Sequence, residues 1–224
     1  GDCFYQMNDF QNSINLYNNF LNKTSKAYFE KLNNAQYNLA YSYYKIRDYD
    51  AAIKYFRKFL ISPNTDTLRK TDAYLRLADS YYLLSNFVMA NENYTIVENY
   101  NVFDQDYAIY QKSKCAALLS DFTNQEKELL KLHKRFKNSV YYEKSVYDLA
   151  NLYKSIEKNN LAIEYYNKVI SLTSNSELLA KSLYNKSLVF ENLSMIDSAI
   201  VTLRKVIQDF RLTSSFRNAS LNLK

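Results

Sequence analysis

The sequence is poor in the residues that turns, phosphate-binding loops and many catalytic sites require. It contains 1 glycine, 1 proline, 1 histidine, 2 cysteines and no tryptophan in 224 residues. Average proteins carry roughly 7 % glycine and 5 % proline. β-rich and doubly wound folds use these residues at their turns, and phosphate loops need several glycines. The scarcity therefore argues against those folds and favours an all-helical chain.

Residue clusters with catalytic or metal-binding chemistry are equally scarce. His133 is the only histidine and lies in a basic segment expected at a helix C-terminus, where cations offset the helix dipole. Cys3 and Cys115 are far apart in the sequence, so they suggest packing thiols more than a disulfide or a zinc site. Glu126 and Glu128 are two residues apart and would face different sides of a helix. We therefore predict no enzymatic activity, no cofactor and no metal site.

Charge and hydropathy also limit the choice of partners. The net charge is +6, from 29 basic and 23 acidic residues, and no apolar run approaches the roughly 18 residues of a membrane span. The strongest basic cluster consists of Lys127, Lys131, Lys134, Arg135 and Lys137. We interpret it as a solvated helix face and expect no nucleic acid partner. RNA binding stays open as an alternative, which would show a steep salt dependence.

A helical repeat is the dominant positive signal. In the stretch 35–60 two short amphipathic helices flank a polar turn at Arg47 and Asp48. The same pattern recurs along the chain at steps of 35 to 39 residues. Small residues mark the middle of each first helix, at Gly1, Ala40, Ala78, Ser113, Ala150 and Ser187. Twelve residues later the second helices carry Ser13, Ala52, Ala90, Gln125, Ala162 and Ala199, followed after four residues by Tyr17, Phe56, Tyr94, Leu129, Tyr166 and Leu203.

This spacing predicts stacked helix pairs, because a small residue lets two helices approach while a large one fills the groove with the next pair. We expect an all-α, right-handed α-solenoid of about six antiparallel helix pairs. The predicted repeats span residues 1–25, 26–64, 65–103, 104–138, 139–174 and 175–212, and a further helix starts in 213–224. Ser62-Pro63-Asn64 is expected to break a helix, and Asp66 or Thr67 to cap the next one. Since the pattern starts and stops inside a repeat, we expect a segment of a longer protein.

The repeats resemble tetratricopeptide repeats (TPRs). The resemblance is carried by a small eighth residue, Tyr near position eleven (Tyr43, Tyr81, Tyr153), Ala at position twenty and an aromatic residue at position twenty-four. The units depart from the family pattern in lacking Trp, in exceeding 34 residues and in keeping the expected proline only near Pro63. The strings RLADSYY and FKNSVYYEKSVYDLANLY are in addition similar to large multi-repeat TPR proteins of Bacteroidota. This second resemblance implies a periplasmic or outer-membrane-associated location.

The TPR resemblance implies a binding site on the concave face, which the first helix of each pair lines. Carried over position by position, it gives an amphipathic, tyrosine-rich set of partner-binding residues. The set consists of Tyr5, Tyr37, Tyr41, Tyr44, Arg76, Asp79, Tyr82, Tyr110, Lys114, Tyr147, Asn151 and Tyr184. Tyrosine offers a large contact area at low entropy cost together with one hydroxyl. The alternative interpretation is that these tyrosines only pack between neighbouring helices.

The leading hypothesis is a non-enzymatic scaffold that binds a partner protein or peptide along this face, with other envelope proteins among the candidate partners. An alternative from another class is an envelope-associated glycan-binding protein, because aromatic rings stack on sugars. Self-association of the open ends is a third hypothesis. The sequence does not distinguish among these ligands.

Overall fold

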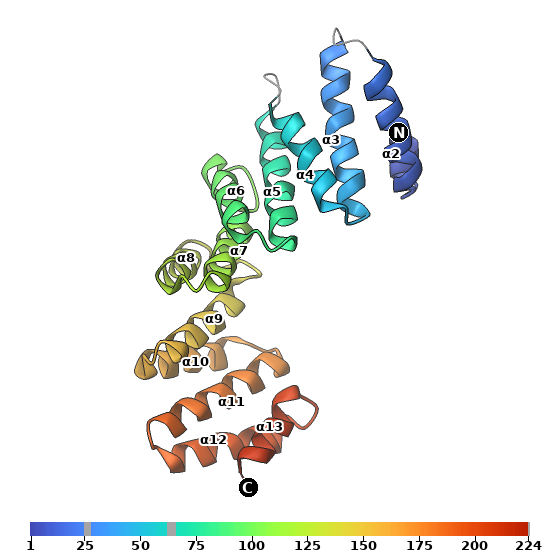
Figure 1. Cartoon of the computed structure of the whole chain (residues 1–224). Coiled ribbons are helices and arrows are strands. Elements are labelled where there is room, and N and C mark those ends of the chain that lie inside the picture. The colour runs from blue at the N-terminus through green and yellow to red at the C-terminus, as the bar shows by residue number, and fades with distance from the viewer. Residues whose placement is uncertain (25–27, 62–65, 224) are drawn as a thin grey trace. The chain divides into compact units, whose positions relative to one another are not determined.

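The computed structural model describes residues 1–24, 28–61 and 66–223. These residues form helices joined by short turns, without any strand, as the composition predicts. The chain divides into two compact units, residues 1–121 and 122–224. The boundary between the units falls inside the predicted repeat 104–138. Within each unit every helix packs against the next one along the chain (Figure 1).

Unit 1 contains seven helices among its described residues. They are α1 (Asp2–Gln6), α2 (Phe10–Lys23), α3 (Phe29–Lys45), α4 (Tyr49–Leu60), α5 (Thr67–Leu83), α6 (Phe87–Tyr100) and α7 (Gln105–Leu118). Unit 2 contains α8 (Phe122–Arg135), α9 (Tyr142–Ser155), α10 (Asn159–Leu172), α11 (Ser176–Asn192), α12 (Ile196–Asp209) and α13 (Ser214–Asn222). The all-α fold and the helix pairs expected around the repeat anchors are therefore present. The breaker Ser62-Pro63-Asn64 and the expected repeat ends near residues 25 and 64 lie outside the described residues.

The repeat template identifies the core. The small anchors Ala40, Ala78 and Ala150 have no exposed surface, and neither do the large residues Phe56 and Tyr166 that fill the grooves. Phe20, three residues after the groove-filling Tyr17, remains 36 % exposed and lines an open pocket of about 330 Å³ beside α2 and α3. The core positions follow from the sequence because only small residues permit the close helix approach that buries the large ones.

All six turns between the two helices of a pair share one backbone conformation. The residue seven positions after each small anchor is left-handed, with φ between 57° and 65°, at Asn8, Arg47, Ser85, Ser120, Glu157 and Ser194. At each turn two backbone N–H groups close the helix C-terminus; in α3 the Arg47 N–H donates to the Tyr44 carbonyl and the Asp48 N–H to the Tyr43 carbonyl. This is the Schellman motif, which glycine usually completes. Because glycine is absent from all six, the sequence hides this signal.

In three of the turns the residue after the left-handed position also caps the second helix. The Asp9, Asp48 and Asn86 side chains accept hydrogen bonds from the backbone N–H three residues later. Lys158 and Met195 occupy the same place without a side-chain cap. Asp66 caps α5 by accepting from the Arg69 N–H at 2.9 Å, which confirms one of the two predicted cap residues. The turns are thus built from paired helix-ending and helix-starting signals.

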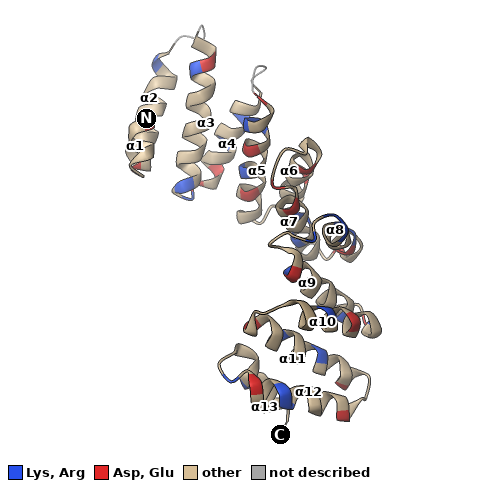
Figure 2. Ribbon diagram, turned by 180° about the vertical axis from the view of Figure 1, so that it is seen from behind, with Lys and Arg blue, Asp and Glu red and all other residues tan. Residues whose placement is uncertain are grey.

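Charge is distributed without a run of one sign. Figure 2 shows acidic and basic residues interspersed on the helices of both units. None of the helices in the described ranges has the length and apolar character that crossing a bilayer requires. Most charged residues are therefore solvated surface, and the exceptions are the buried groups described below.

Candidate functional site

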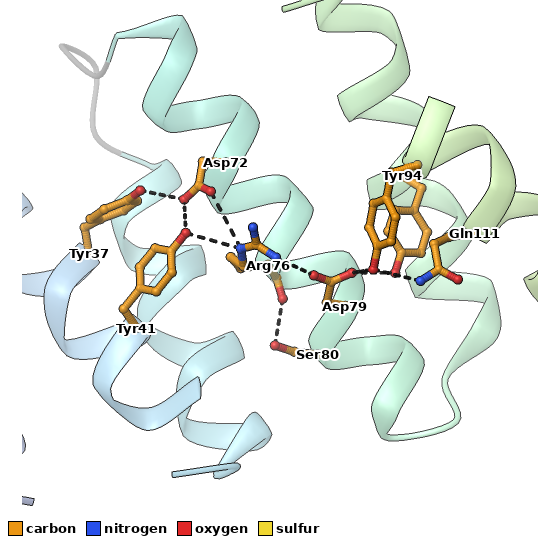
Figure 3. Close-up of polar contacts among 9 residues, drawn as sticks. Tyr37, Tyr41, Asp72, Arg76, Asp79, Ser80, Tyr94 and Gln111 are labelled. Carbon is orange, nitrogen blue, oxygen red and sulfur yellow. Dashed lines mark hydrogen bonds and ion pairs between the residues drawn. The ribbon is translucent and has the colours of Figure 1, made fainter. Parts of the chain in front are cut away.

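In unit 1 the predicted partner-binding residues gather on one surface, which we call the first-helix face because α1, α3, α5 and α7 supply it. Its centre is a row of three charged residues on α5, namely Asp72, Arg76 and Asp79 (Figure 3). Their spacing of four and three residues places all three side chains on the same side of the helix. Tyrosines from the neighbouring helices surround this row.

Asp72 joins α5 to α3. Its Oδ2 atom accepts a hydrogen bond from the Tyr37 hydroxyl at 2.5 Å and another from the Tyr41 hydroxyl. The Arg76 Nε lies 3.3 Å from the Tyr41 hydroxyl oxygen and 3.6 Å from Asp72 Oδ1. The Arg69 guanidinium covers the Tyr37 ring at 5.0 Å. These contacts fix both tyrosine rings on the first-helix face.

Asp79 joins α5 to α6 and α7 in the same way. Its Oδ1 accepts from the hydroxyls of Tyr94 at 2.7 Å and Tyr107 at 2.8 Å, and its Oδ2 accepts from Arg76 Nη1 at 2.9 Å. Gln111 Nε2 in turn donates to the Tyr107 oxygen at 2.7 Å. Arg76 therefore lies between two aspartates, each of which accepts from two tyrosines (Figure 3).

The electrostatics of this row keep its groups in one protonation state. Burial raises the pKa of Tyr41, and the neighbouring Asp72 raises it further. Burial and Asp79 do the same for the pKa of Tyr94. Burial opposes the charge on Arg76, but Tyr41 and the two aspartates outweigh it and raise the Arg76 pKa. The tyrosines thus stay neutral donors and the arginine stays charged throughout the physiological pH range.

The outer members of the predicted set line the same surface. Burial raises the pKa of Tyr5, and Asp72 raises it further; burial and Asp79 do the same for the pKa of Tyr44. Arg76 opposes both shifts, so both rings lie near the charged row. Tyr82 packs edge-on against Phe87 at 5.5 Å, and the Lys114 ammonium lies 4.7 Å from the Tyr82 ring centre.

Two members of the set lie too deep to contact a ligand in this conformation. Tyr110 is 5 % exposed and Asp79 is 6 % exposed. Asp79 shapes the first-helix face indirectly, by accepting hydrogen bonds that position Arg76, Tyr94 and Tyr107. Tyr37, Tyr41, Tyr44, Arg76 and Tyr82 remain partly exposed. For Tyr110 the alternative interpretation therefore holds: this tyrosine packs between helices.

Unit 2 has its own first-helix face on α9 and α11, with the predicted residues Tyr147, Asn151 and Tyr184 partly exposed. The Tyr147 hydroxyl accepts from Asn185 Nδ2 at 2.8 Å, and Asn151 Oδ1 accepts from the Tyr166 hydroxyl at 2.6 Å. In the repeat alignment Asn151 takes the place of Asp79, and Asn185 takes the place of Arg76.

Sequence reasoning missed several residues that organise these faces, above all Asp72, Tyr107 and Asn185. One available signal was the spacing of Asp72, Arg76 and Asp79, which already places opposite charges on one helix face. The partners of Asp72 lie more than thirty positions away on α3, so the sequence alone does not identify them.

Of the other candidates, Cys115 and His133 have structural surroundings, whereas the predicted packing role is wrong for Cys3, which is exposed. The Cys115 thiol is buried, and burial raises its pKa to about 12, which suppresses the reactive thiolate. His133 Nε2 lies 2.6 Å from the Lys168 ammonium and 3.4 Å from the Tyr142 hydroxyl. Burial and the nearby cations Lys168 and Lys137 lower the pKa of His133. Within the described ranges, no group of three or more His, Cys, Asp or Glu side chains has a metal-binding arrangement.

Both glutamates considered on α8 and one lysine of the basic cluster have partners. Glu126 accepts from the Tyr153 hydroxyl at 2.7 Å, and Glu128 pairs with Lys131 at 2.7 Å. Of the basic cluster, Lys127, Lys134, Arg135 and Lys137 are exposed. The Glu128 carboxylate beside Lys131 weakens the field that a nucleic acid would meet.

Comparison with known families identifies two of the repeats. Residues 34–65 and residues 142–176 each match a family model of the tetratricopeptide repeat. One match lies in unit 1 and the other in unit 2, each with a first and a second helix. A search of curated protein sequences found no match.

Solved structures of helical-repeat proteins share the fold. MamA is 18 % identical, with a TM-score of 0.64 over 76 % of this chain and 93 % of that chain. BtubC from P. vanneervenii is 14 % identical, with a TM-score of 0.62 over 96 % and 92 %. YrrB, described as a TPR protein with an unusual peptide-binding site, is 12 % identical, with a TM-score of 0.65 over 84 % and 91 %. At these low identities the TM-scores show a shared fold alone.

Proposed function

We propose that this chain, which carries tetratricopeptide repeats, is a non-enzymatic scaffold that binds extended segments of a partner protein, each on the first-helix face of one unit. The observation that carries the proposal is the Asp72–Arg76–Asp79 row, which holds tyrosines of three neighbouring helices in place. A preorganised surface loses little conformational entropy on binding. The likeness to YrrB, a structure described with a peptide-binding site, supports peptide as the ligand class.

The rings that remain available define where the ligand would lie. The hydroxyl groups of Tyr37 and Tyr41 both donate hydrogen bonds to Asp72. A ligand could therefore contact the edges of these two rings and donate to the lone pairs of their hydroxyl oxygens. The hydroxyl protons of Tyr82 and Tyr184 have no acceptor among the described residues. Half-buried aromatic rings flanked by polar groups are typical of protein-binding hot spots.

Selection of peptides on the intact chain tests the proposal. A displayed library of random peptides about twelve residues long is selected on the wild-type protein, and affinities are then measured for Tyr44→Ser and Tyr82→Ser. Tyr55→Ser is the matched control, because Tyr55 is a half-buried tyrosine of the second helix α4, stacked on Tyr43 at 5.6 Å. We expect roughly tenfold weaker binding for the first two variants and no change for the control.

The same experiment can contradict the proposal. Peptides that bind all three variants with wild-type affinity would show that the first-helix face is not the binding surface. Circular dichroism confirms that each variant keeps its helices before affinities are compared. A glycan array probed with the wild-type chain tests the glycan-binding alternative, and sedimentation of the chain alone tests self-association.

The cellular location belongs to the proposal as well. The resemblance to large repeat proteins of Bacteroidota supports a periplasmic or outer-membrane-associated protein. Fractionation of a Bacteroidota cell that expresses the full-length protein tests this directly, and recovery in the cytoplasmic fraction would contradict it.

A further inference from the structure

Unit 1 contains a hollow of about 370 Å³ that residues of α4, α5 and α6 line. The helix α5 packs against both of the second helices α4 and α6 (Figure 1). Much of the lining is apolar and comes from Leu60, Leu77, Met89 and Ile96. None of the described residues that line the hollow belongs to the partner-binding set predicted from the sequence. The hollow is therefore a site separate from the first-helix face.

Two buried polar groups line this apolar hollow. Tyr81 is 9 % exposed and Asn93 is 5 % exposed. The Asn93 Nδ2 atom donates to the Met89 carbonyl oxygen at 2.7 Å, whereas Asn93 Oδ1 and the Tyr81 hydroxyl have no partner among the described residues. Buried polar groups normally have hydrogen-bond partners. A ligand in the hollow would supply them.

Two other repeats fill the equivalent place with a tyrosine ring. In the repeat alignment Tyr81 corresponds to Tyr43 and Tyr153, and Asn93 corresponds to Tyr55 and Tyr165. The two tyrosines contact each other in both repeats, with ring centres 5.6 Å apart for Tyr43 and Tyr55 and 5.2 Å apart for the other pair. The Asn93 side chain is smaller than a tyrosine ring and leaves this space open.

The remaining walls of the hollow correspond as well. Leu21 packs in the same cluster as Tyr55, and Leu60 takes the place of Leu21 beside the hollow. The Tyr55 hydroxyl donates to Asn18 Oδ1 at 3.1 Å, and Arg57 takes the place of Asn18. The exposed Arg57 guanidinium offers donors to a hydroxyl oxygen. The hollow thus has the walls of a tyrosine site without the tyrosine.

We propose that this hollow binds a tyrosine side chain of a different protein. The ring packs against Tyr81, its hydroxyl oxygen accepts from Arg57, and Asn93 Oδ1 accepts from a peptide N–H of the partner. A protein side chain is the occupant because the two filled repeats show that a tyrosine attached to a backbone matches these walls. A volume of this size also accommodates part of that backbone. The inference goes beyond the proposed function and does not depend on it.

NMR of the methionine methyl groups in the intact chain tests the site without needing the partner. The chain has 3 methionines, of which Met89 lines the hollow, while Met7 and Met195 are exposed and serve as internal controls. Met89→Leu assigns the Met89 signal. The probes are acetyl-tyrosine N-methylamide, acetyl-phenylalanine N-methylamide, which lacks the hydroxyl, acetyl-leucine N-methylamide, which lacks the ring, and p-cresol, which lacks the peptide groups.

We expect a saturable shift of the Met89 signal with the tyrosine compound, with a Kd on the order of 1 mM. The phenylalanine compound should bind roughly fivefold more weakly, and the leucine compound should leave the signal unchanged. A Met89 shift no larger than those of Met7 and Met195 would overturn the inference. Equal affinity for the phenylalanine compound would overturn the assignment of a tyrosine, and tighter binding of p-cresol the assignment of a protein side chain.

The variant Asn93→Tyr restores the residue that two other repeats carry. Its own ring should fill the hollow and abolish binding of the tyrosine compound, while circular dichroism shows unchanged helix content. Asn99→Tyr adds the same ring at an exposed position of α6 and should bind as the wild type does. Wild-type affinity in Asn93→Tyr would refute the site. If this variant does not fold, the titration of the wild-type chain decides alone.

The same variant separates this site from the first-helix face. Peptides whose binding depends on Tyr44 and Tyr82 should bind Asn93→Tyr with wild-type affinity, so either proposal can fail while the other stands. Sedimentation tests a second copy of the chain as the occupant. A wild-type chain that self-associates and an Asn93→Tyr chain that is monomeric would overturn the assignment of a different protein.

Discussion

Replacement of Asp79 by alanine is the most informative perturbation of the first-helix face. Asp79 is 6 % exposed and accepts from three donors, on Arg76, Tyr94 and Tyr107. The substitution leaves all three donors without this acceptor. It should therefore destabilise unit 1 more than the removal of any one of the donors.

The magnitude follows from the burial of each donor. A buried donor left unsatisfied costs about 1–3 kcal/mol, which applies in full to Tyr94 because its side chain has no exposed surface. Tyr107 is partly exposed and adds about 1 kcal/mol. Arg76 keeps Asp72 and has 29 % of its side chain exposed, so its share is discounted for solvent screening. We expect Asp79→Ala to lower the free energy of unfolding by about 3 kcal/mol and Tyr94→Phe by about 1 kcal/mol.

Urea denaturation followed by circular dichroism measures these values. The double variant Asp79→Ala/Tyr94→Phe should lose about 1 kcal/mol less than the sum of the single losses, because the two residues share one hydrogen bond. Asp50→Asn, an exposed acidic residue in the first turn of α4, is the control and should change stability by less than about 1 kcal/mol. A loss for Asp79→Ala no larger than for this control, or fully additive effects in the double variant, would refute the account of the network.

Three further predictions concern the turns and the histidine. Glu157→Gly should stabilise unit 2 by about 0.5–1 kcal/mol, because glycine adopts the left-handed backbone at φ 59° without strain, at some cost in unfolded-chain entropy. Glu157→Ala should not stabilise unit 2, because alanine keeps the strain. Equal melting temperatures for the two variants would contradict this prediction. Met195→Asp should add about 1 kcal/mol by supplying the side-chain cap that α12 lacks, measured by urea denaturation against Met195→Ala. The folded-state pKa of His133 is lowered, so the unfolded chain binds the proton more readily and stability should fall as the pH drops below about 6.5 towards the folded pKa. Because His133 is the single histidine, His133→Gln should remove this slope, and an unchanged slope would show that other groups cause it.

Core positions were predictable from the sequence because they depend on residue size and spacing. Ala40, Ala78, Phe56 and Tyr166 are buried where the template placed them. Asp66 caps its helix as one of two expected candidates, because a capping side chain just before a helix is a local signal. The turn conformation was hidden, since Arg, Glu and Ser occupy the left-handed position that glycine normally reveals.

The candidate site was predictable only in outline. Periodicity places Tyr37, Tyr110 and Tyr147 at one repeat position, but their exposure depends on the helices that pack beside them. Tyr110 is buried, whereas the other two are partly exposed. The pairing of Asp72 with Tyr37 joins residues 35 positions apart in the sequence, on different helices. Local pattern says nothing about which carboxylate a hydroxyl will reach across a helix interface.

The most direct test of the central claim maps a selected peptide onto the chain by hydrogen exchange. We expect new protection of backbone amides in the first helices α3, α5, α9 and α11 when the peptide is bound, with little change in the second helices α4, α6, α10 and α12. Protection confined to the second helices would place the ligand on the opposite surface and contradict the assignment of the first-helix faces as the binding site.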